Sequence, residues 1–403
     1  MQENKSNIVA SSAAFADTKP HYEILNGLRG AAALMVVWYH VFEGFAFAEG
    51  TGIDTFNHGH LGVDFFFMLS GFVISYAYDD RWQGNDGNRL TLGNFFKRRL
   101  IRLHPMIIIG AIIGTITFLL QGGVKWDGSS TPISWVMVAL MLTMLFIPAW
   151  PGAGYDVRGN GEMYSLNGPA WSLFFEYIGN IMYALFIRRL PTRMLACLCI
   201  ITGGLWAWFG ITNVSGYDML GVGWTLDVHN FLGGLLRMTF PFTLGMLLAR
   251  NFKPVKVPGI FWISIAVLFS LFSVPYISSE GYAWAEGLSL NSLYEIMCIV
   301  LVFPVIVWLG ASGSQRSRIT CMSAGISSKV CKFLGDLSYP LYIVHYPVMY
   351  LFYAWLIENK LYSLGETWQV VILVFAVNIT LALACLKLWD EPVRRWLTKR
   401  FIR

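Results

Sequence analysis

Long apolar stretches alternate with short polar segments along nearly the whole chain. Ten of these stretches approach or exceed about 20 residues, the length at which an α-helix crosses the hydrocarbon core of a bilayer. They lie at residues 24–46, 61–78, 104–120, 170–187, 194–212, 230–249, 259–276, 290–310, 335–356 and 367–389. The pattern predicts an all-α polytopic membrane protein with about ten transmembrane helices.

An eleventh apolar stretch, residues 133–149, is interpreted through the distribution of charge. Lys and Arg gather in the N-terminus and in segments 81–102, 188–193, 250–256, 316–332 and 394–403, whereas segments 47–60, 213–229 and 277–289 contain none. Cytoplasmic loops carry the excess of Lys and Arg, and ten spans put every basic segment on one side. We therefore expect both termini to be cytoplasmic and 133–149 to be a re-entrant or interfacial segment.

Composition supports a membrane protein, since 56% of the residues are hydrophobic and 13% are charged, against roughly 25% charged in soluble domains. Residues 1–20 are polar and lack the apolar core of a cleavable signal peptide. We expect them to be a cytoplasmic tail, residues 21–396 to form a single membrane domain, and 397–403 to be a basic cytoplasmic tail. The basic loops explain the positive net charge without a nucleic-acid partner. The six cysteines lack the spacing of a zinc site, and no metal is expected.

Arg29 and His40 begin and end the apolar run "RGAAALMVVWYH". An ionisable side chain inside a membrane span is costly and marks a functional site by default. Eleven residues of helix bring the two to within roughly 20° of the same face, with His40 about 16 Å deeper, near the middle of the membrane. As alternatives, Arg29 could snorkel to the boundary and His40 could pair with another helix.

A second cluster is "FFKRRLIRLHP", in which Arg99 and Arg102 stand three residues apart. On a helix both would point the same way. Paired guanidinium groups suit the multidentate recognition of phosphate. The alternative is that these charges fix the topology or contact anionic lipid.

Four further ionisable residues lie in or at the edge of predicted spans. Glu176, in "NGPAWSLFFEY", is expected one turn into its span, where His40 is a candidate partner. Asp64 opens the second span and could equally anchor the end of that helix. His345 lies in mid-span, and for Arg237 both a structural pairing and ligand contact remain open.

These residues would combine guanidinium groups at the cytoplasmic mouth, titratable groups in the membrane and a polar loop within 121–169 on the outer side. A phosphate-bearing donor could then enter from inside and a hydroxyl acceptor from outside. Histidine titrates near neutral pH and suits removal of the hydroxyl proton during attack on an acyl carbon. A proton-coupled transporter or exporter, with His40 and Glu176 as relay groups, is the alternative.

Six ordered motifs resemble the integral-membrane acyltransferase-3 family, whose members O-acylate glycans and other exported molecules. They are "LNGLRGAAALMVVWYH", "GHLGVDFFFMLSGFVIS", "FFKRRLIRLHP", "NGPAWSLFFEY", "LGDLSYPLYIVHYPV" and "DEPVRRW". The resemblance is dense over 24–187 and 333–396. His104 departs from the pattern, because an aromatic residue is more usual before the proline. The chain ends soon after "DEPVRRW", so we expect no additional esterase-like domain in it.

The resemblance implies that His40 is the catalytic residue acting on the acceptor hydroxyl and that Glu176 supports it. It also implies that Arg29, Arg99 and Arg102 bind the acyl-CoA donor from the cytoplasm. Possible supporting residues are Asp64, Trp171, Arg237 and His345. Direct transfer and a covalent acyl relay are both open, although Ser70 in "LSGF" is expected to pack helices rather than to act as a nucleophile.

We therefore expect an O-acyltransferase in the cytoplasmic (plasma) membrane. It would move an acyl group, with acetyl as the expected one, from acyl-CoA to a hydroxyl of an extracytoplasmic glycan or lipid-linked sugar. Acyl-CoA would be a donor substrate, and no bound cofactor is expected. The sequence leaves the oligomeric state open.

Overall fold

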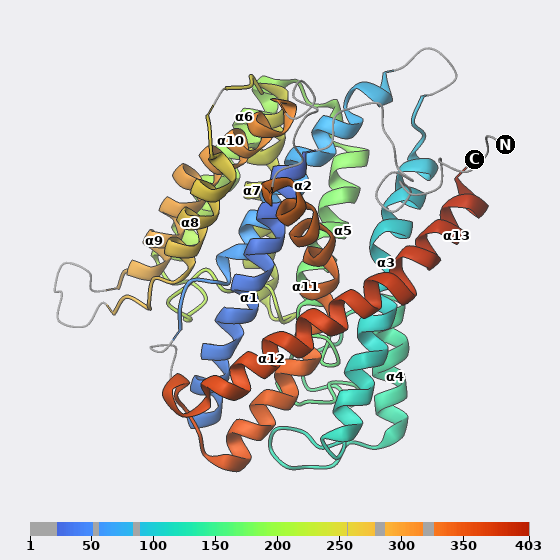
Figure 1. Cartoon of the computed structure of the whole chain (residues 1–403), viewed down its shortest axis with the longest axis vertical. Coiled ribbons are helices and arrows are strands. Elements are labelled where there is room, and N and C mark those ends of the chain that lie inside the picture. The colour runs from blue at the N-terminus through green and yellow to red at the C-terminus, as the bar shows by residue number, and fades with distance from the viewer. Residues whose placement is uncertain are drawn as a thin grey trace.

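The computed structural model describes residues 22–50, 56–83, 89–255, 257–278, 287–316 and 326–402. These residues form a bundle of helices and connecting loops without a β-strand (Figure 1). The polar tail expected at 1–20 lies outside the described residues. The expected all-α polytopic fold is confirmed.

Nine helical segments of the described chain are long and apolar enough to cross a membrane. They are α1 (Glu23–Glu49), α2 (Leu61–Tyr78, with the short η3, Asp80–Trp82), α3 (Leu92–Leu120), α5 (Ala170–Leu185, with η4, Ile187–Arg189), α6 (Thr192–Ile211), α7 (Val228–Arg250), α9 (Leu290–Met297) joined through η6 (Cys298–Val302) to α10 (Phe303–Arg316), α11 (Ile326–Asn359), and α12 (Leu364–Cys385) joined through η7 (Leu386–Asp390) to α13 (Glu391–Phe401). Nine of the ten predicted spans thus have a helix of sufficient length.

The predicted span at 259–276 differs, because its helix α8 (Ile260–Phe272) has only 13 residues. That length corresponds to about 20 Å, which is less than the roughly 30 Å of a hydrocarbon core. The apolar pattern continues beyond the helix, but Pro275 pairs with Asn57 in an isolated bridge. Hydropathy therefore overestimated this helix by including an extended segment.

The helix in the predicted re-entrant or interfacial segment 133–149 is α4 (Ile133–Met144), whose 12 residues are too few to cross a hydrocarbon core. The chain on either side of it meets at one end of the bundle, since the Trp126 N–H donates to the Arg158 carbonyl at 3.2 Å. The Thr131 hydroxyl likewise donates to the Val157 carbonyl at 3.0 Å. The segment therefore leaves and returns on the same side.

Two closely packed helix pairs form the middle of the bundle, between α6 with α8–α10 on one side and α3, α4 and α13 on the other (Figure 1). In the pair α1–α11, a Cβ at Gly30 would lie 2.1 Å from the Leu334 carbonyl oxygen. In the pair α2–α7, a Cβ at Gly71 would lie 1.9 Å from the Phe242 carbonyl oxygen. Such close approach requires glycine, as is typical of membrane helices. It brings the polar faces of these helices together.

Candidate functional site

His40, on α1, forms a short hydrogen bond with a carboxylate of its own helix. Its Nδ1 lies 2.5 Å from Oε2 of Glu43, three residues along the chain. The same oxygen accepts hydrogen bonds from the hydroxyls of Tyr353 at 2.8 Å and Tyr346 at 3.2 Å, both on α11. A carboxylate with three donors is stabilised in its ionised form, so Nδ1 of the histidine donates the proton of this hydrogen bond and Nε2 points away from Glu43. This arrangement leaves Nε2 available as a general base.

Glu43 is the functional residue that the sequence analysis missed. Residues three apart share one face of a helix, so the spacing His40–Glu43 was the available signal. The analysis had instead considered Glu176 as the carboxylate partner of His40. The structure places Glu176 elsewhere, because α5 begins inside the bundle, where the Ser172 hydroxyl lies 2.7 Å from that of Tyr342. Glu176 follows one turn deeper along that helix.

His345 lies beside His40, as its mid-span position suggested. The two ring centroids are 5.2 Å apart. Nδ1 of His345 lies 2.9 Å from the Tyr342 carbonyl oxygen and therefore carries a proton. Its Nε2 is buried without a hydrogen-bond partner among the described residues. A second imidazole, whose Nε2 has no hydrogen-bond partner among the described residues, thus lies close to the His40–Glu43 pair.

Glu176 belongs to a separate cluster with the predicted donor-binding arginines. Its Oε1 lies 2.5 Å from Nη2 of Arg99 and accepts a hydrogen bond of 3.0 Å from Ser70. Arg29 and Arg102 are both within electrostatic reach of Arg99 and Glu176. The structure therefore brings together all three arginines that the sequence singled out. Ser70 has a polar partner in addition to the packing role expected of it.

The arginine cluster carries more positive than negative charge. Within the described part of the chain, neither Arg29 nor Arg102 has a hydrogen-bond or ion-pair partner. Asp390, another carboxylate in electrostatic reach of Arg102, pairs with Arg394 at 2.9 Å. Unbalanced cations inside a membrane protein are costly and mark ligand pathways. The cluster is therefore a candidate site for an anion.

Arg237 forms a closed ion pair with Asp64, in contrast to that cluster. Its Nη2 and Nε lie 2.8 and 3.1 Å from the carboxylate oxygens. Its Nη1 and Nη2 also donate, each at 3.0 Å, to the carbonyls of Val222 and His60. The ring of Trp171 lies 5.2 Å from the guanidinium carbon. Three predicted supporting residues thus come together. Asp64 is the partner that a structural pairing of Arg237 requires.

A polar network links the loop between α4 and α5 to His40 and Glu43. Arg158 lies over the ring of Tyr350, 3.5 Å from its centroid, and donates to the side chain of Gln121 at 2.8 Å. Glu162 accepts a hydrogen bond from the Tyr350 hydroxyl, and burial raises the pKa of Glu162 to about 7. Tyr350 packs edge-on against Tyr346, the residue that donates to Glu43. The sequence predicted a polar loop here but singled out neither Arg158 nor Glu162.

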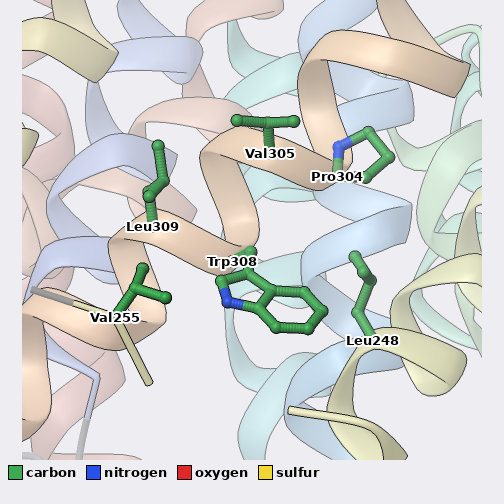
Figure 2. Close-up of a pocket in the computed structure, with 6 residues that line it drawn as sticks. All are labelled: Leu248, Val255, Pro304, Val305, Trp308 and Leu309. Atoms are coloured by element: carbon green, nitrogen blue, oxygen red, sulfur yellow. The ribbon is translucent and has the colours of Figure 1, made fainter. Parts of the chain in front are cut away.

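A cavity of about 310 Å³ lies away from these polar groups (Figure 2). It is lined by Leu248, Val255, Pro304, Val305, Trp308 and Leu309. The indole nitrogen of Trp308 donates to the Lys253 carbonyl at 2.9 Å. The lining supplies no ionisable side chain, so this cavity offers no group for acid–base chemistry.

Comparisons with known proteins agree with this arrangement. Residues 22–387 match the acyltransferase-3 family, described as an acyltransferase domain. Protein 2 in picA locus of Rhizobium radiobacter is 33% identical over 171 residues, which cover 40% of this chain and 80% of that protein. Peptidoglycan O-acetyltransferase OatA of Listeria monocytogenes is 25% identical over 344 residues, or 81% of this chain and 49% of OatA. Acyltransferase MdmB of Streptomyces mycarofaciens is 29% identical over 184 residues, or 42% and 41%.

The chain thus spans about half the length of OatA and less of MdmB. No solved structure matches it significantly. The family match nevertheless extends from the first turn of α1 to the end of α12 and includes His40 and the arginine cluster. The chain belongs to the acyltransferase-3 family, as its ordered motifs predicted.

Proposed function

We propose that this protein is a membrane O-acyltransferase of the plasma membrane. It transfers an acyl group, with acetyl as the expected one, from acyl-CoA to a hydroxyl of an extracytoplasmic glycan or lipid-linked sugar. Both termini would be cytoplasmic. The observation that carries the proposal is the His40–Glu43 pair on the same helix as Arg29, the first residue of the anion-binding cluster.

The donor would enter at the arginine cluster. Arg29, Arg99 and Arg102 would bind its phosphates, and Glu176 would hold the guanidinium of Arg99 in place. Arg29 and His40 are eleven residues apart on one face of α1, or about 16 Å. The pantetheine arm of coenzyme A is a long flexible chain between phosphate and thioester. This separation therefore suits a donor whose phosphates and reacting carbon must be held at different depths.

The transfer would use His40 as the general base. Nε2 accepts the proton of the acceptor hydroxyl while that oxygen attacks the thioester carbonyl. The tetrahedral intermediate then collapses, the carbon–sulfur bond breaks, and the leaving thiolate takes the proton from the imidazolium. Glu43 stabilises the imidazolium between these steps, as a carboxylate does in a catalytic triad. The products are the ester and free coenzyme A.

Direct transfer is the simpler of the two routes left open by the sequence. Among the described residues, no serine or cysteine side chain is hydrogen-bonded to the His40 ring. The Ser70 hydroxyl donates to Glu176 instead. A relay nucleophile is activated by hydrogen-bond contact with its base, so these contacts favour a two-substrate reaction without an acyl-enzyme.

The test uses protein purified into nanodiscs, with acetyl-CoA as the probe and its hydrolysis as the readout. We expect the double variant Arg99→Ala, Arg102→Ala to lose donor binding. We expect His40→Ala to bind acetyl-CoA but to lose hydrolysis, whereas His229→Ala, an exposed histidine at the start of α7, retains both. If folded wild-type protein fails to bind acetyl-CoA, the proposal is wrong, and solute flux in proteoliposomes would then test the transporter alternative.

A further inference from the structure

A cationic cavity lies at the end of the bundle where α2 and α5 end and the chain leads into α3. It has a volume of about 470 Å³ and is lined by Asp79, Trp82, Gln83, Arg89, Arg188 and Arg189. That volume falls within the range of about 300–1,000 Å³ that is typical of small-molecule sites. None of these residues belongs to the donor-binding set described above.

The charge of this cavity is positive and unbalanced. Arg188 is within electrostatic reach of both Arg89 and Arg189. The carboxylate in the lining, Asp79, is already used: Oδ2 lies 2.9 Å from Nε of Arg250, and Oδ1 accepts from the Tyr183 hydroxyl at 2.7 Å. Three guanidinium groups therefore converge without a free carboxylate in the lining. Such an arrangement suits a multiply charged anion, above all phosphate.

Two of the three guanidinium groups are held by the fold. Arg89 Nε donates to the Trp82 carbonyl at 3.0 Å, and Arg188 Nε donates to the Ala184 carbonyl at 2.6 Å. Arg188 also lies 4.0 Å above the centre of the buried Trp82 ring. Within the described chain their Nη groups have no partner. Their free donors are thus oriented before any ligand arrives, which lowers the entropic cost of binding.

The cavity also adjoins the deeper arginine cluster. Tyr78, the last residue of α2, is within electrostatic reach of Arg102, and the next residue, Asp79, lines the cavity. In the other direction, Arg188 follows Glu176 by twelve residues, or about 18 Å of helix. A ligand that occupies both sites must be long and must carry phosphate at two places. Acyl-CoA is such a molecule, with a pyrophosphate in its arm and a 3′-phosphate on its ribose.

We propose that this cavity binds the phosphorylated nucleotide head of the acyl-CoA donor, with Arg188 and Arg189 at its 3′-phosphate. The assignment rests on the proposed function, and it adds a second recognition point to it. The headgroup of an anionic lipid also offers a phosphate group. A lipid phosphodiester carries one charge and lacks the terminal monoester, which carries nearly two. The 3′-phosphate is therefore the feature to test.

The experiment compares the dissociation constants of coenzyme A and 3′-dephospho-coenzyme A by calorimetry. The protein is held in nanodiscs of phosphatidylcholine alone or with added phosphatidylglycerol. The variants are Arg188→Gln with Arg189→Gln, and the single change Arg189→Gln, which alters an exposed side chain and leaves the Arg188–Trp82 stack in place. The control, Lys399→Gln with Arg400→Gln, removes two exposed charges from α13 without touching the cavity.

We expect wild type to bind coenzyme A about tenfold more tightly than the dephospho form, which corresponds to about 1.4 kcal/mol. The double variant should lose this preference by weakening only the binding of coenzyme A. The single variant should lose part of it and the α13 control none. Equal binding of both ligands by wild type would overturn the inference, as would a preference that survives the double change.

The same experiment distinguishes a lipid headgroup from the 3′-phosphate of coenzyme A. It also distinguishes failure of this inference from failure of the proposed function. If phosphatidylglycerol abolishes the preference of wild type for coenzyme A over the dephospho form, the lipid headgroup occupies the cavity in its place and the inference is wrong; a preference that persists with phosphatidylglycerol supports the inference. If wild type binds neither form of coenzyme A, the donor assignment in the proposed function fails. If it binds both equally, that assignment stands and only the nucleotide-head site is rejected.

Discussion

Two groups of arginines on the long apolar helices differ in whether their charge is balanced. Arg237 has all three nitrogen atoms of its guanidinium engaged by Asp64 and by two carbonyls. The other group is Arg29, Arg99 and Arg102, which lie around the carboxylate of Glu176; among the described residues Arg99 is the one arginine of the three that hydrogen-bonds to it. From sequence, all four look alike as costly cations in apolar helices. Arg99 and Arg237 are buried and Arg29 and Arg102 are half-buried, so burial alone does not separate the two groups. The partners separate a structural arginine from a ligand-binding one.

This contrast has an energetic consequence that can be measured. A closed ion pair contributes to folding mainly because removal of one partner leaves the other charged and buried. An open cluster of like charges opposes folding and is stabilised when an anion binds. Changes in the closed pair should therefore lower thermal stability. Changes in the open cluster should lower donor affinity instead.

The largest effect is expected for Asp64→Ala, which leaves Arg237 buried without a carboxylate. Such a loss costs about 3–5 kcal/mol. We expect a large fall in the thermal unfolding midpoint, which is measured by tryptophan fluorescence in detergent. The double change Asp64→Leu, Arg237→Met should recover much of it, because no unpaired charge remains. An unfolding midpoint unchanged by Asp64→Ala would contradict the structural assignment of this pair.

The next effect concerns the carboxylate beside His40. Glu43→Gln keeps the shape and an acceptor oxygen but cannot stabilise the imidazolium by charge. We expect acetyl-CoA hydrolysis to fall about a hundredfold, or about 2.7 kcal/mol in the barrier, with donor affinity unchanged. Glu358→Gln, an exposed carboxylate at the end of α11, is the control. If Glu43→Gln weakens donor binding and leaves turnover intact, Glu43 belongs to the donor site instead.

A smaller effect is expected at Glu162, whose pKa is raised to about 7 by burial in the outer loop. An unfolded glutamate has a pKa near 4.3, so the folded state binds the proton more tightly between these values. Stability from this group is therefore full at low pH and is lost as the pH rises toward 7. Glu162→Gln should remove that loss. The free energy of unfolding of the variant, relative to that of wild type, should therefore rise by about 2 kcal/mol between pH 5.5 and pH 8.

The measurement compares the unfolding midpoints of wild type and Glu162→Gln at the two pH values. Arg158 is within electrostatic reach of this carboxylate, but its Nη1 and Nε donate to Gln121 and Ser165. Glu162 thus has a cationic neighbour that is engaged elsewhere. Its charge balance is intermediate between the closed Asp64–Arg237 pair and the open arginine cluster. The same pH dependence in both proteins would mean that another group is responsible for it.

The sequence predicted the helices better than it predicted their partners. Apolar length located nine spans, because the hydrophobic effect acts on whole segments. It overestimated α8, where a bridge to Asn57 holds the apolar residues after the helix. The prediction for 133–149 agrees with the short helix α4, whose flanking segments meet at one end of the bundle.

The partner of each buried charge was harder to predict. Asp64 and Arg237 are distant in sequence, and nothing local in either segment indicates their contact. Glu43 was detectable from its spacing to His40, but a carboxylate near a helix end also suits a solvent boundary. Glu176 was assigned the wrong depth because the loop before it descends into the bundle, where the Leu166 carbonyl packs against Gly114. Such a loop has no hydropathy signal.

The smallest effect, and the sharpest test of the contrast, is expected for Arg29→Gln. This residue has no hydrogen-bond partner in the described chain and lies near Arg99 and Glu176. Its removal reduces repulsion, so the unfolding midpoint should not fall. Acetyl-CoA should bind about tenfold more weakly, which corresponds to one lost charge-assisted contact of about 1.4 kcal/mol. Arg29→Lys keeps the charge without the planar guanidinium group, so its affinity for acetyl-CoA should lie between those of wild type and Arg29→Gln. A midpoint lowered as far as in Asp64→Ala, with donor affinity intact, would instead make Arg29 a second structural arginine, and the distinction between balanced and unbalanced guanidinium groups would no longer predict function.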